Sequence, residues 1–242
     1  MVVQMRKEAN MNLLPLVSFA MRYQPIWDMQ LKQVMGYEAT VCGVRGEPAA
    51  TMFRQHAHDI VSFDTKLICR AVYEGVQLLQ GNQMLFINVH PKTLAKGVNV
   101  PLWQGQGHNH QRIVFEITEK TQITGAVKAG MLMLQNQGFN LAVDDFGKQY
   151  SNLDRLLNDW FQPAFLKLDR SFVSAVELDH AQLIVKHTSD LCQKLGIKLI
   201  CEGVETAHQL ELLLDCGVRY VQGYHLGYPE YASVYRGGIV NE

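Results

Sequence analysis

Two adjacent carboxylates, Asp144 and Asp145, follow the short apolar run 141–143 and precede Phe146 and Gly147. A short apolar run of this kind predicts a buried strand. Two carboxylates at its end repel each other unless a positive charge lies beside them, and a divalent cation is the usual partner. An Asp-Asp pair beside a glycine is also common in surface turns. The stretch alone slightly favours the turn.

The same order of residue types recurs along the chain and indicates what positions this pair. A short apolar run ends at a polar residue, and a helical stretch and a glycine follow. This alternation predicts βα units around a parallel sheet. The predicted strands are 84–87, 113–115, 141–143, 164–166, 197–201 and 218–221. They end at Asn88, Glu116, Asp144, Lys167, Glu202 and Gln222, and Glu38, within 34–44, is expected to join this set.

Helices are expected between these strands. Apolar residues at helical spacing predict a helix over 60–81, and glycines are expected to end most of the helices. Thr206 and Gln209 have the spacing of a capping box, which predicts a helix start. The remaining helices are expected from 126 to 138, around 153–157, over 172–195 and from 206 to 217.

The polar strand ends decide between two α/β architectures. In a closed (β/α) barrel the carboxyl ends of the strands face one another, and active sites lie there. An open doubly wound sheet would spread the same residues along a line. The sequence contains no glycine-rich nucleotide-binding motif that would favour the open sheet. A barrel with an anionic mouth is therefore expected.

Several carboxylates and the Asn88 oxygen form a ligand set that favours Mg²⁺ or Mn²⁺. Such a cluster can hold two ions about 3.5–4 Å apart, as in two-metal phosphodiester hydrolysis. Lys167 is expected to orient or help deprotonate a water, to offset the carboxylate charge, or to form a structural ion pair. Glu202 can be a ligand or the general base, and the sequence does not separate these roles.

Composition excludes some partners and compartments. The 242 residues carry a formal net charge of -1, which gives no electrostatic case for duplex nucleic acid or an anionic membrane. The five cysteines show no CxxC spacing, which argues against a disulfide framework and fits the cytoplasm. No apolar run approaches the roughly 18 residues of a membrane span.

Eight motifs, in order over nearly the whole chain, resemble those of the EAL-domain phosphodiesterases, here as a stand-alone EAL protein. Members of that family hydrolyse cyclic di-GMP to linear pGpG. The motifs are Tyr23-Gln24-Pro25-Ile26, Gly36-Tyr37-Glu38-Ala39, Ile87-Asn88-Val89, Phe115-Glu116-Ile117-Thr118-Glu119, Asp144-Asp145-Phe146-Gly147, Leu166-Lys167-Leu168-Asp169-Arg170-Ser171-Phe172, Glu202-Gly203-Val204-Glu205-Thr206 and Gln222-Gly223-Tyr224.

The resemblance implies a modified TIM (β/α)8 barrel with one antiparallel strand, two Mg²⁺ or Mn²⁺ ions per site, a cytoplasmic location and a homodimer. It divides the chain into an N-terminal extension 1–20, an EAL domain 21–232 and a C-terminal tail 233–242. The implied metal ligands are Glu38, Asn88, Glu116, Asp144, Asp145 and Glu202.

The resemblance also assigns roles to individual side chains. Glu38, Asp145, Lys167 and Glu202 are the implied catalytic residues. Glu119 and Glu205 are implied to support the site, Glu119 by holding the loop after the Asp-Asp pair. The implied substrate-binding residues are Thr40, Asp169, Gln222 and Tyr228.

Some positions depart from the family pattern. The signature Glu-Ala-Leu reads Glu38-Ala39-Thr40, and Cys42 stands where relatives usually carry an arginine that contacts a substrate phosphate. Arg45 is near, but an offset of three residues places it on the other strand face. Lys148-Gln149 alters the loop after Gly147, and Tyr228 replaces a residue that is often basic. Since no matched ligand is lost, we expect an active enzyme with weakened substrate affinity. The alternative is a cyclic di-GMP receptor or a regulator that binds a protein partner.

Overall fold

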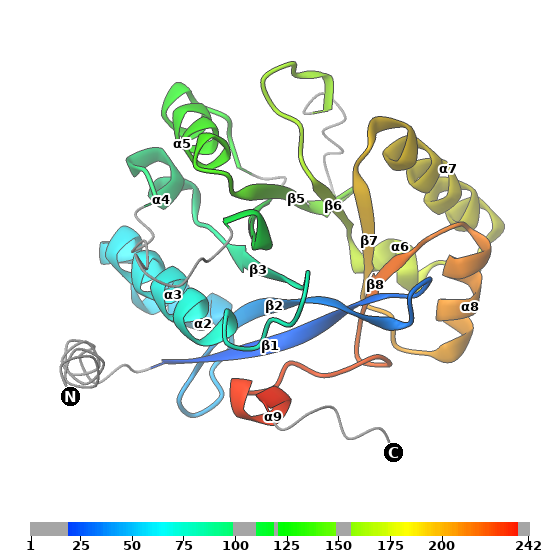
Figure 1. Cartoon of the computed structure of the whole chain (residues 1–242), viewed down its shortest axis with the longest axis horizontal. Coiled ribbons are helices and arrows are strands. Elements are labelled where there is room, and N and C mark those ends of the chain that lie inside the picture. Colours follow the sequence, from blue (N-terminus) through cyan, green and yellow to red (C-terminus); the bar gives the residue numbers. More distant parts are fainter. Residues whose placement is uncertain (1–18, 99–109, 119–120, 149–155, 237–242) are drawn as a thin grey trace.

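Eight strands close into a barrel in the order in which they occur in the chain (Figure 1). This computed structural model describes residues 19–98, 110–118, 121–148 and 156–236. The strands are β1 Phe19–Asp28, β2 Gln33–Gly43, β3 Met84–Asn88, β4 Ile113–Thr118, β5 Asn140–Phe146, β6 Phe165–Leu168, β7 Lys198–Glu202 and β8 Tyr220–Gln222.

Helices surround the strands on the outside of the barrel (Figure 1). Two short 3-10 helices, η1 Ala57–Asp59 and η2 His110–Arg112, precede α3 and β4. The α-helices are α2 Ala49–Gln55, α3 Ile60–Gly75, α4 Pro91–Lys96, α5 Gly125–Asn136, α6 Arg170–Ser174, α7 Asp179–Leu195, α8 Ala207–Asp215 and α9 Ala232–Arg236.

The barrel contains one antiparallel strand, as predicted. β1 pairs antiparallel with both β2 and β8. The other neighbours, from β2 round to β8, pair in parallel. The (β/α) barrel is thereby confirmed, and the open doubly wound sheet is wrong.

An apolar layer fills the barrel interior directly beneath the polar strand ends. Each interior residue on β3 to β8 lies two positions before a predicted site residue, as Phe86 precedes Asn88. Because side chains alternate along a strand, residues two positions apart share a face. The layer is closed by an edge-to-face contact of Phe86 and Phe165, with ring centroids 4.9 Å apart. Its buried members are Ile26, Phe86, Val114, Ala142, Phe165, Ile200 and Tyr220.

Two helices differ from the prediction. The helix expected over 60–81 ends at Gly75, where Leu78 turns back and its N–H donates to the Gly75 carbonyl. Leu78 is buried, so its burial competes with continuation of the helix. The single helix expected over 172–195 is two helices, α6 and α7, because Leu178 is extended at the start of α7. The capping box of Thr206 and Gln209 is confirmed at the start of α8.

The ends of several elements also differ. Glu38 lies in the middle of β2, since β2 continues to Gly43 while only its Gly36–Ala39 portion pairs with β3. β4 and β5 extend two residues past the predicted strand-end carboxylates Glu116 and Asp144. Of the helix expected around 153–157, residues 153–155 lie outside the described residues.

The predicted C-terminal tail begins inside a helix. Residues 233–236 belong to α9, and the ring of Tyr235 lies 5.0 Å from that of Tyr37. The Tyr235 hydroxyl donates to the Tyr228 carbonyl at 2.9 Å, so these contacts fix α9 against the domain. At the other end, β1 already begins at Phe19. Within the described part of the chain, no helix has the length and apolar character needed to cross a bilayer.

Candidate active site

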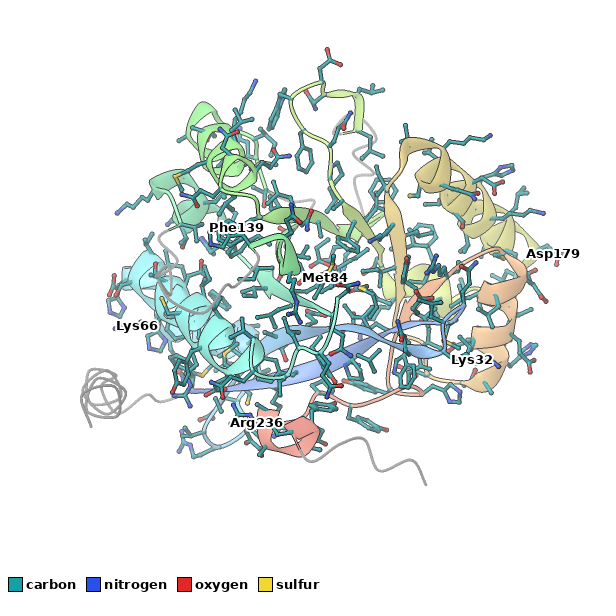
Figure 2. All side chains as sticks on the ribbon, viewed as in Figure 1. Lys32, Lys66, Met84, Phe139, Asp179 and Arg236 are labelled. Atoms are coloured by element: carbon teal, nitrogen blue, oxygen red, sulfur yellow. The ribbon has the colours of Figure 1, made fainter. Side chains whose placement is uncertain are left out.

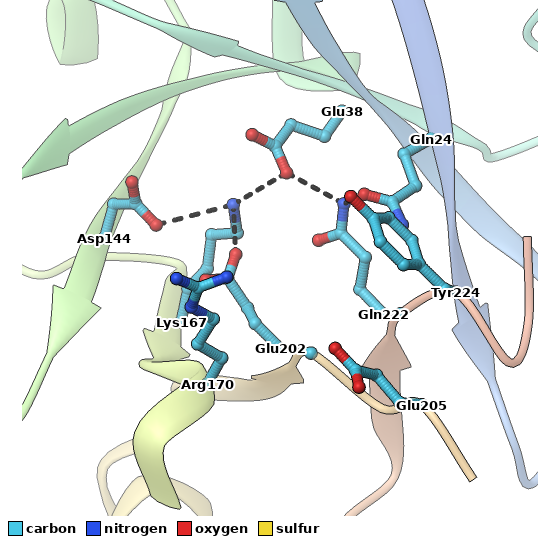
Figure 3. Close-up of a pocket in the computed structure, with 11 residues that line it drawn as sticks. Gln24, Glu38, Asp144, Lys167, Arg170, Glu202, Glu205, Gln222 and Tyr224 are labelled. Carbon is cyan, nitrogen blue, oxygen red and sulfur yellow. Dashed lines mark hydrogen bonds and ion pairs between the residues drawn. The ribbon is translucent and has the colours of Figure 1, made fainter. Parts of the chain in front are cut away.

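Strand register brings the predicted site residues together in pairs. Gln24 of β1 is paired with Glu38 of β2. Asn88 of β3 is paired with Glu116 of β4, and Glu202 of β7 with Gln222 of β8. Paired residues on one face have neighbouring side chains. Residues widely separated in sequence therefore meet at one end of the barrel (Figure 3).

Lys167 occupies the centre of this group. Its ammonium Nζ lies 2.6 Å from Oε1 of Glu116 and 2.6 Å from Oε1 of Glu202. It lies 3.1 Å from Oε2 of Glu38 and 3.4 Å from Oδ1 of Asp144. The Lys167 side chain is only 1% exposed. Four carboxylates thus share one buried ammonium.

Four carboxylates surround a single ammonium, and several of these carboxyl groups have a raised pKa. Burial raises the pKa of Glu116, Asp144 and Glu202, and the neighbouring carboxylates raise it further against the opposing effect of Lys167. Burial alone would lower the pKa of Lys167, but the four surrounding carboxylates raise it well above its usual value. The ammonium therefore stays charged, and a further cation at the cluster would favour the ionised form of these carboxylates.

The donor set suits a hard divalent cation, although its present arrangement is centred on Lys167. Oε1 of Glu116 and Oε1 of Gln222 are buried without a hydrogen-bond donor. The former lies 2.6 Å from the Lys167 ammonium as an ion pair. Within the described residues, no group of three or more Asp, Glu, His and Cys side chains is spaced to hold a metal ion. Carboxylate and amide oxygens fit Mg²⁺ or Mn²⁺, provided that the ammonium moves aside.

Asp144 and Asp145 both lie in β5, so the surface-turn interpretation is wrong. Asp145 has a left-handed backbone with φ 57°, and the pairing of β5 with β6 shifts register between Val143 and Phe146. Asp and Asn tolerate this conformation better than most residues. Both carboxylates consequently line one cavity of about 640 Å³, together with Thr40 and Asn88.

A second cavity of about 230 Å³ opens beside Lys167 (Figure 3). Gln222 lines it and donates through Nε2 to Oε2 of Glu38 at 2.8 Å and to Oε1 of Gln24 at 3.1 Å. Glu205, predicted to support the site, is exposed and lines the same cavity. Glu119, the other predicted supporting residue, lies outside the described residues.

Two predicted substrate-binding residues have other contacts. Asp169 caps α6 by accepting the Ser171 N–H at 2.9 Å, and its other oxygen accepts from Lys148 Nζ at 3.1 Å. Tyr228 stacks on Tyr224 with ring centroids 4.7 Å apart. Tyr228 lines a third cavity of about 330 Å³ at the outer end of β2.

Sequence reasoning missed Arg22, Gln24 and Arg170. Arg22 faces Thr40 across the β1–β2 ribbon and lines the third cavity with Cys42. Arg45, weighed as a substitute for the absent arginine, instead pairs with Glu47 at 3.0 Å and is 85% exposed. The alternation of side chains along β1 would have placed Arg22 and Gln24 on the same face.

Arg170 lines the cavity beside Lys167 (Figure 3). Gly203 lines the same cavity. Gly203 has φ 78°, and a Cβ there would lie 2.5 Å from the Arg170 Cβ. Glycine is therefore required for the chain after β7 to pass Arg170. Arg170 and Gly203 each belong to one of the motifs in the sequence, and this was the available signal that they lie near the site.

A closed (β/α) barrel with a carboxylate and lysine cluster at its mouth defines the class of protein. The EAL domain family profile matches residues 11–229, so the chain belongs to the EAL family. Cyclic di-GMP phosphodiesterase RocR of Pseudomonas aeruginosa is 36% identical over 156 residues, covering 60% of this chain and 38% of RocR. Probable cyclic di-GMP phosphodiesterase PdeN of Escherichia coli is 27% identical over 229 residues, covering 87% of this chain and 43% of PdeN. The chain thus spans less than half the length of these curated relatives.

Solved structures show the same fold. A stand-alone EAL protein of Vibrio cholerae O395 bound to c-di-GMP has a TM-score of 0.73 and 28% identity, over 90% of this chain and 94% of that one. BlrP1 of Klebsiella pneumoniae in its manganese and cy-diGMP complex at pH 9.0 has a TM-score of 0.81 and 29% identity. That match covers 89% of this chain and 57% of BlrP1.

Proposed function

We propose that this protein hydrolyses cyclic di-GMP to linear pGpG in a reaction that depends on Mg²⁺ or Mn²⁺. The observation that carries the proposal is the group of four carboxylates around buried Lys167 at the mouth of an EAL barrel. The names of the curated relatives and the ligands of the structural neighbours support this choice of substrate.

The metal ligands that we propose are Glu38, Asn88, Glu116, Asp144, Asp145 and Glu202, with two ions per site. A bound ion supplies Lewis-acid polarisation of the phosphodiester and of the attacking water. Gln222 fixes the orientation of Glu38 through its 2.8 Å hydrogen bond. Asn88 fixes Glu116 in the same way, because its Nδ2 donates to Oε2 of Glu116 at 2.9 Å.

Two residues can act on the proton of the attacking water. Lys167 keeps its own proton among the carboxylates, so it can donate a hydrogen bond and orient the water. Glu202 lies 2.6 Å from Lys167 and lines the cavity beside it, so its carboxylate is placed to serve as a metal ligand or as the general base. We therefore assign positioning of the water to Lys167 and keep both roles for Glu202.

We propose that the protein acts in the cytoplasm and that it assembles as a homodimer. All five cysteines are free in the structure, which is compatible with a reducing compartment. The homodimer stays a prediction from the family resemblance, and sedimentation equilibrium of the purified chain measures it.

Turnover tests the proposal directly. The purified protein is incubated with cyclic di-GMP and Mn²⁺, Mg²⁺ or EDTA, and products are separated by chromatography. We expect pGpG with either ion and none with EDTA. Glu116→Gln should reduce turnover about 100-fold or more, since it removes a buried charge at the reacting centre. The exposed α7 variant Asp190→Asn serves as a control with the same charge change. Absence of pGpG at high protein concentration contradicts the proposal.

A second candidate is a cyclic di-GMP receptor or a regulator that binds a protein partner. Two features favour it. An uncharged Cys42 lines the third cavity, and Lys148 pairs with Asp145. Calorimetry with cyclic di-GMP separates the candidates. Tight binding without turnover identifies a receptor, whereas absence of binding points to a protein partner.

A further inference from the structure

A lysine that follows β5 folds back onto the rim of the carboxylate cluster. Nζ of Lys148 lies 3.4 Å from Oδ1 of Asp145 and 3.1 Å from Oδ2 of Asp169. The Lys148 backbone N–H also donates to the Asp145 carbonyl at 3.2 Å. Main chain and side chain of Lys148 therefore both bind to the turn that begins at Asp145.

The backbone of this turn fixes where Lys148 points. Asp145 has φ 57° and Gly147 has φ 90°, so the chain reverses within three residues. A Cβ at Gly147 would lie 2.5 Å from the Phe172 ring, which holds the turn against α6. Asp169, the second partner of Lys148, is itself fixed as the cap of α6. The ammonium thus lies between two anchored carboxylates.

The two lysines of the site differ in how easily another cation can replace them. Lys167 is 1% exposed and is shared by four carboxylates. Lys148 is 37% exposed and Asp145 is 30% exposed, so water reaches their contact. A solvent-accessible ion pair contributes little stability, so its ammonium exchanges readily. Asp169 is 5% exposed and would retain the ammonium after it leaves Asp145.

We propose that Lys148 is an internal cation that competes with a divalent cation for Asp145 and so sets the ion concentration at which the site fills. The inference rests on the proposed function only in that Asp145 is taken to bind Mg²⁺ or Mn²⁺. Removal of the ammonium leaves Asp145 without its partner and lowers the positive potential at the cavity. Divalent cations should then bind more tightly.

Mn²⁺ binding without nucleotide tests the proposal, with free Mn²⁺ followed by electron paramagnetic resonance. Lys148→Met should lower the Kd of the weaker bound ion about 2- to 5-fold, a coupling of the size seen for partly exposed charge pairs. Lys148→Arg keeps the charge and should restore a Kd close to that of the wild type. Lys66→Met removes the same charge from an exposed position on α3, at the periphery of the molecule in Figure 2, and should leave the Kd unchanged.

A double-mutant cycle assigns the effect to Asp145. In the Asp145→Asn background, adding Lys148→Met should tighten Mn²⁺ binding less than it does in the wild type, because the contested carboxylate is gone. The inference is overturned if Lys148→Met binds Mn²⁺ no more tightly than the wild type does. It is also overturned if Lys66→Met gains as much affinity as Lys148→Met. If the wild type forms no pGpG but Lys148→Met shows the predicted shift in Kd, the proposed reaction is contradicted and this inference is supported. If the Kd of Lys148→Met is unchanged and the wild type turns over normally, this inference is overturned and the proposed reaction is supported.

Discussion

Asp144 and Asp145 line one cavity although adjacent side chains of a regular strand point to opposite faces. The left-handed backbone of Asp145, with φ 57°, and the register shift that ends at Phe146 produce this convergence. Asp144 points inward to Lys167, while Asp145 stays at the rim beside Lys148. The bulge at the end of β5 thereby gives the site two carboxylates from consecutive residues.

Substitutions at Asp145 should separate its charge from its backbone conformation. Asp145→Asn keeps a residue that tolerates φ > 0, so we expect stability within about 0.5 kcal/mol of the wild type. Turnover of cyclic di-GMP should fall about 100-fold or more because the carboxylate is lost. Asp145→Ala should lose the same activity and an additional 1 kcal/mol or so of stability. Urea unfolding and pGpG formation measure the two effects, and equal stability of the Asn and Ala variants contradicts the backbone argument.

Lys167→Met should destabilise the protein and make its stability depend on divalent ions. Removal of the ammonium leaves the buried Glu116 and three partly buried carboxylates without a counter-charge, at a cost of about 3–5 kcal/mol. Mn²⁺ should restore part of this loss, whereas EDTA should not. Thermal unfolding with each additive measures the difference, with Lys66→Met as the control. If Lys167→Met and the wild type have the same Tm in EDTA, Lys167 does not stabilise the protein as a counter-charge.

Arg22 should contribute to substrate affinity in place of the missing charge at Cys42. Its guanidinium lies 4.8 Å above the Tyr231 ring and lines the cavity that contains Cys42 and Tyr228. A fixed guanidinium there can bind a phosphate or a base carbonyl. Arg22→Ala should raise the KM for cyclic di-GMP about 10-fold with little change in kcat. Arg45→Ala, which removes an exposed arginine paired with Glu47, should change neither constant.

The buried carboxyl of Asp64 should make stability fall as pH rises. Burial raises the pKa of Asp64 to about 6, against the hydrogen bond from the His90 N–H. Because this carboxyl binds its proton more tightly in the folded state, the contribution is fully present below about pH 4, the unfolded pKa. It is lost as pH rises through about 6.

Asp64→Asn isolates this effect, since the amide resembles the protonated acid. The variant and the wild type should be similarly stable near pH 4, and the variant should be more stable at pH 7 by up to about 2–3 kcal/mol. Urea unfolding midpoints at several pH values measure the difference. A difference that is independent of pH contradicts the raised pKa.

The sequence by itself predicted a (β/α) barrel and the carboxylates that gather around Lys167. Apolar runs that end in Asn88, Glu116, Asp144, Lys167, Glu202 and Gln222 predict strands whose carboxyl ends share one face. This prediction needs only local periodicity, because the apolar residues two positions earlier form the interior layer. The family resemblance likewise predicted one antiparallel strand, and the structure identifies it as β1.

Tertiary structure decided the contacts that depend on strand register and on the sign of the backbone angle φ. The pairing of β1 with β2 places Arg22 beside Thr40, and no pattern within either strand fixes which residues pair. The division of 172–195 into α6 and α7 follows from the extended backbone of Leu178, which helical periodicity does not reveal. The positive φ of Asp145 depends on packing around β5 and β6, and together with the positive φ of Gly147 it brings Lys148 to the rim of the site. Long-range pairing energies, rather than local preference, fix these features.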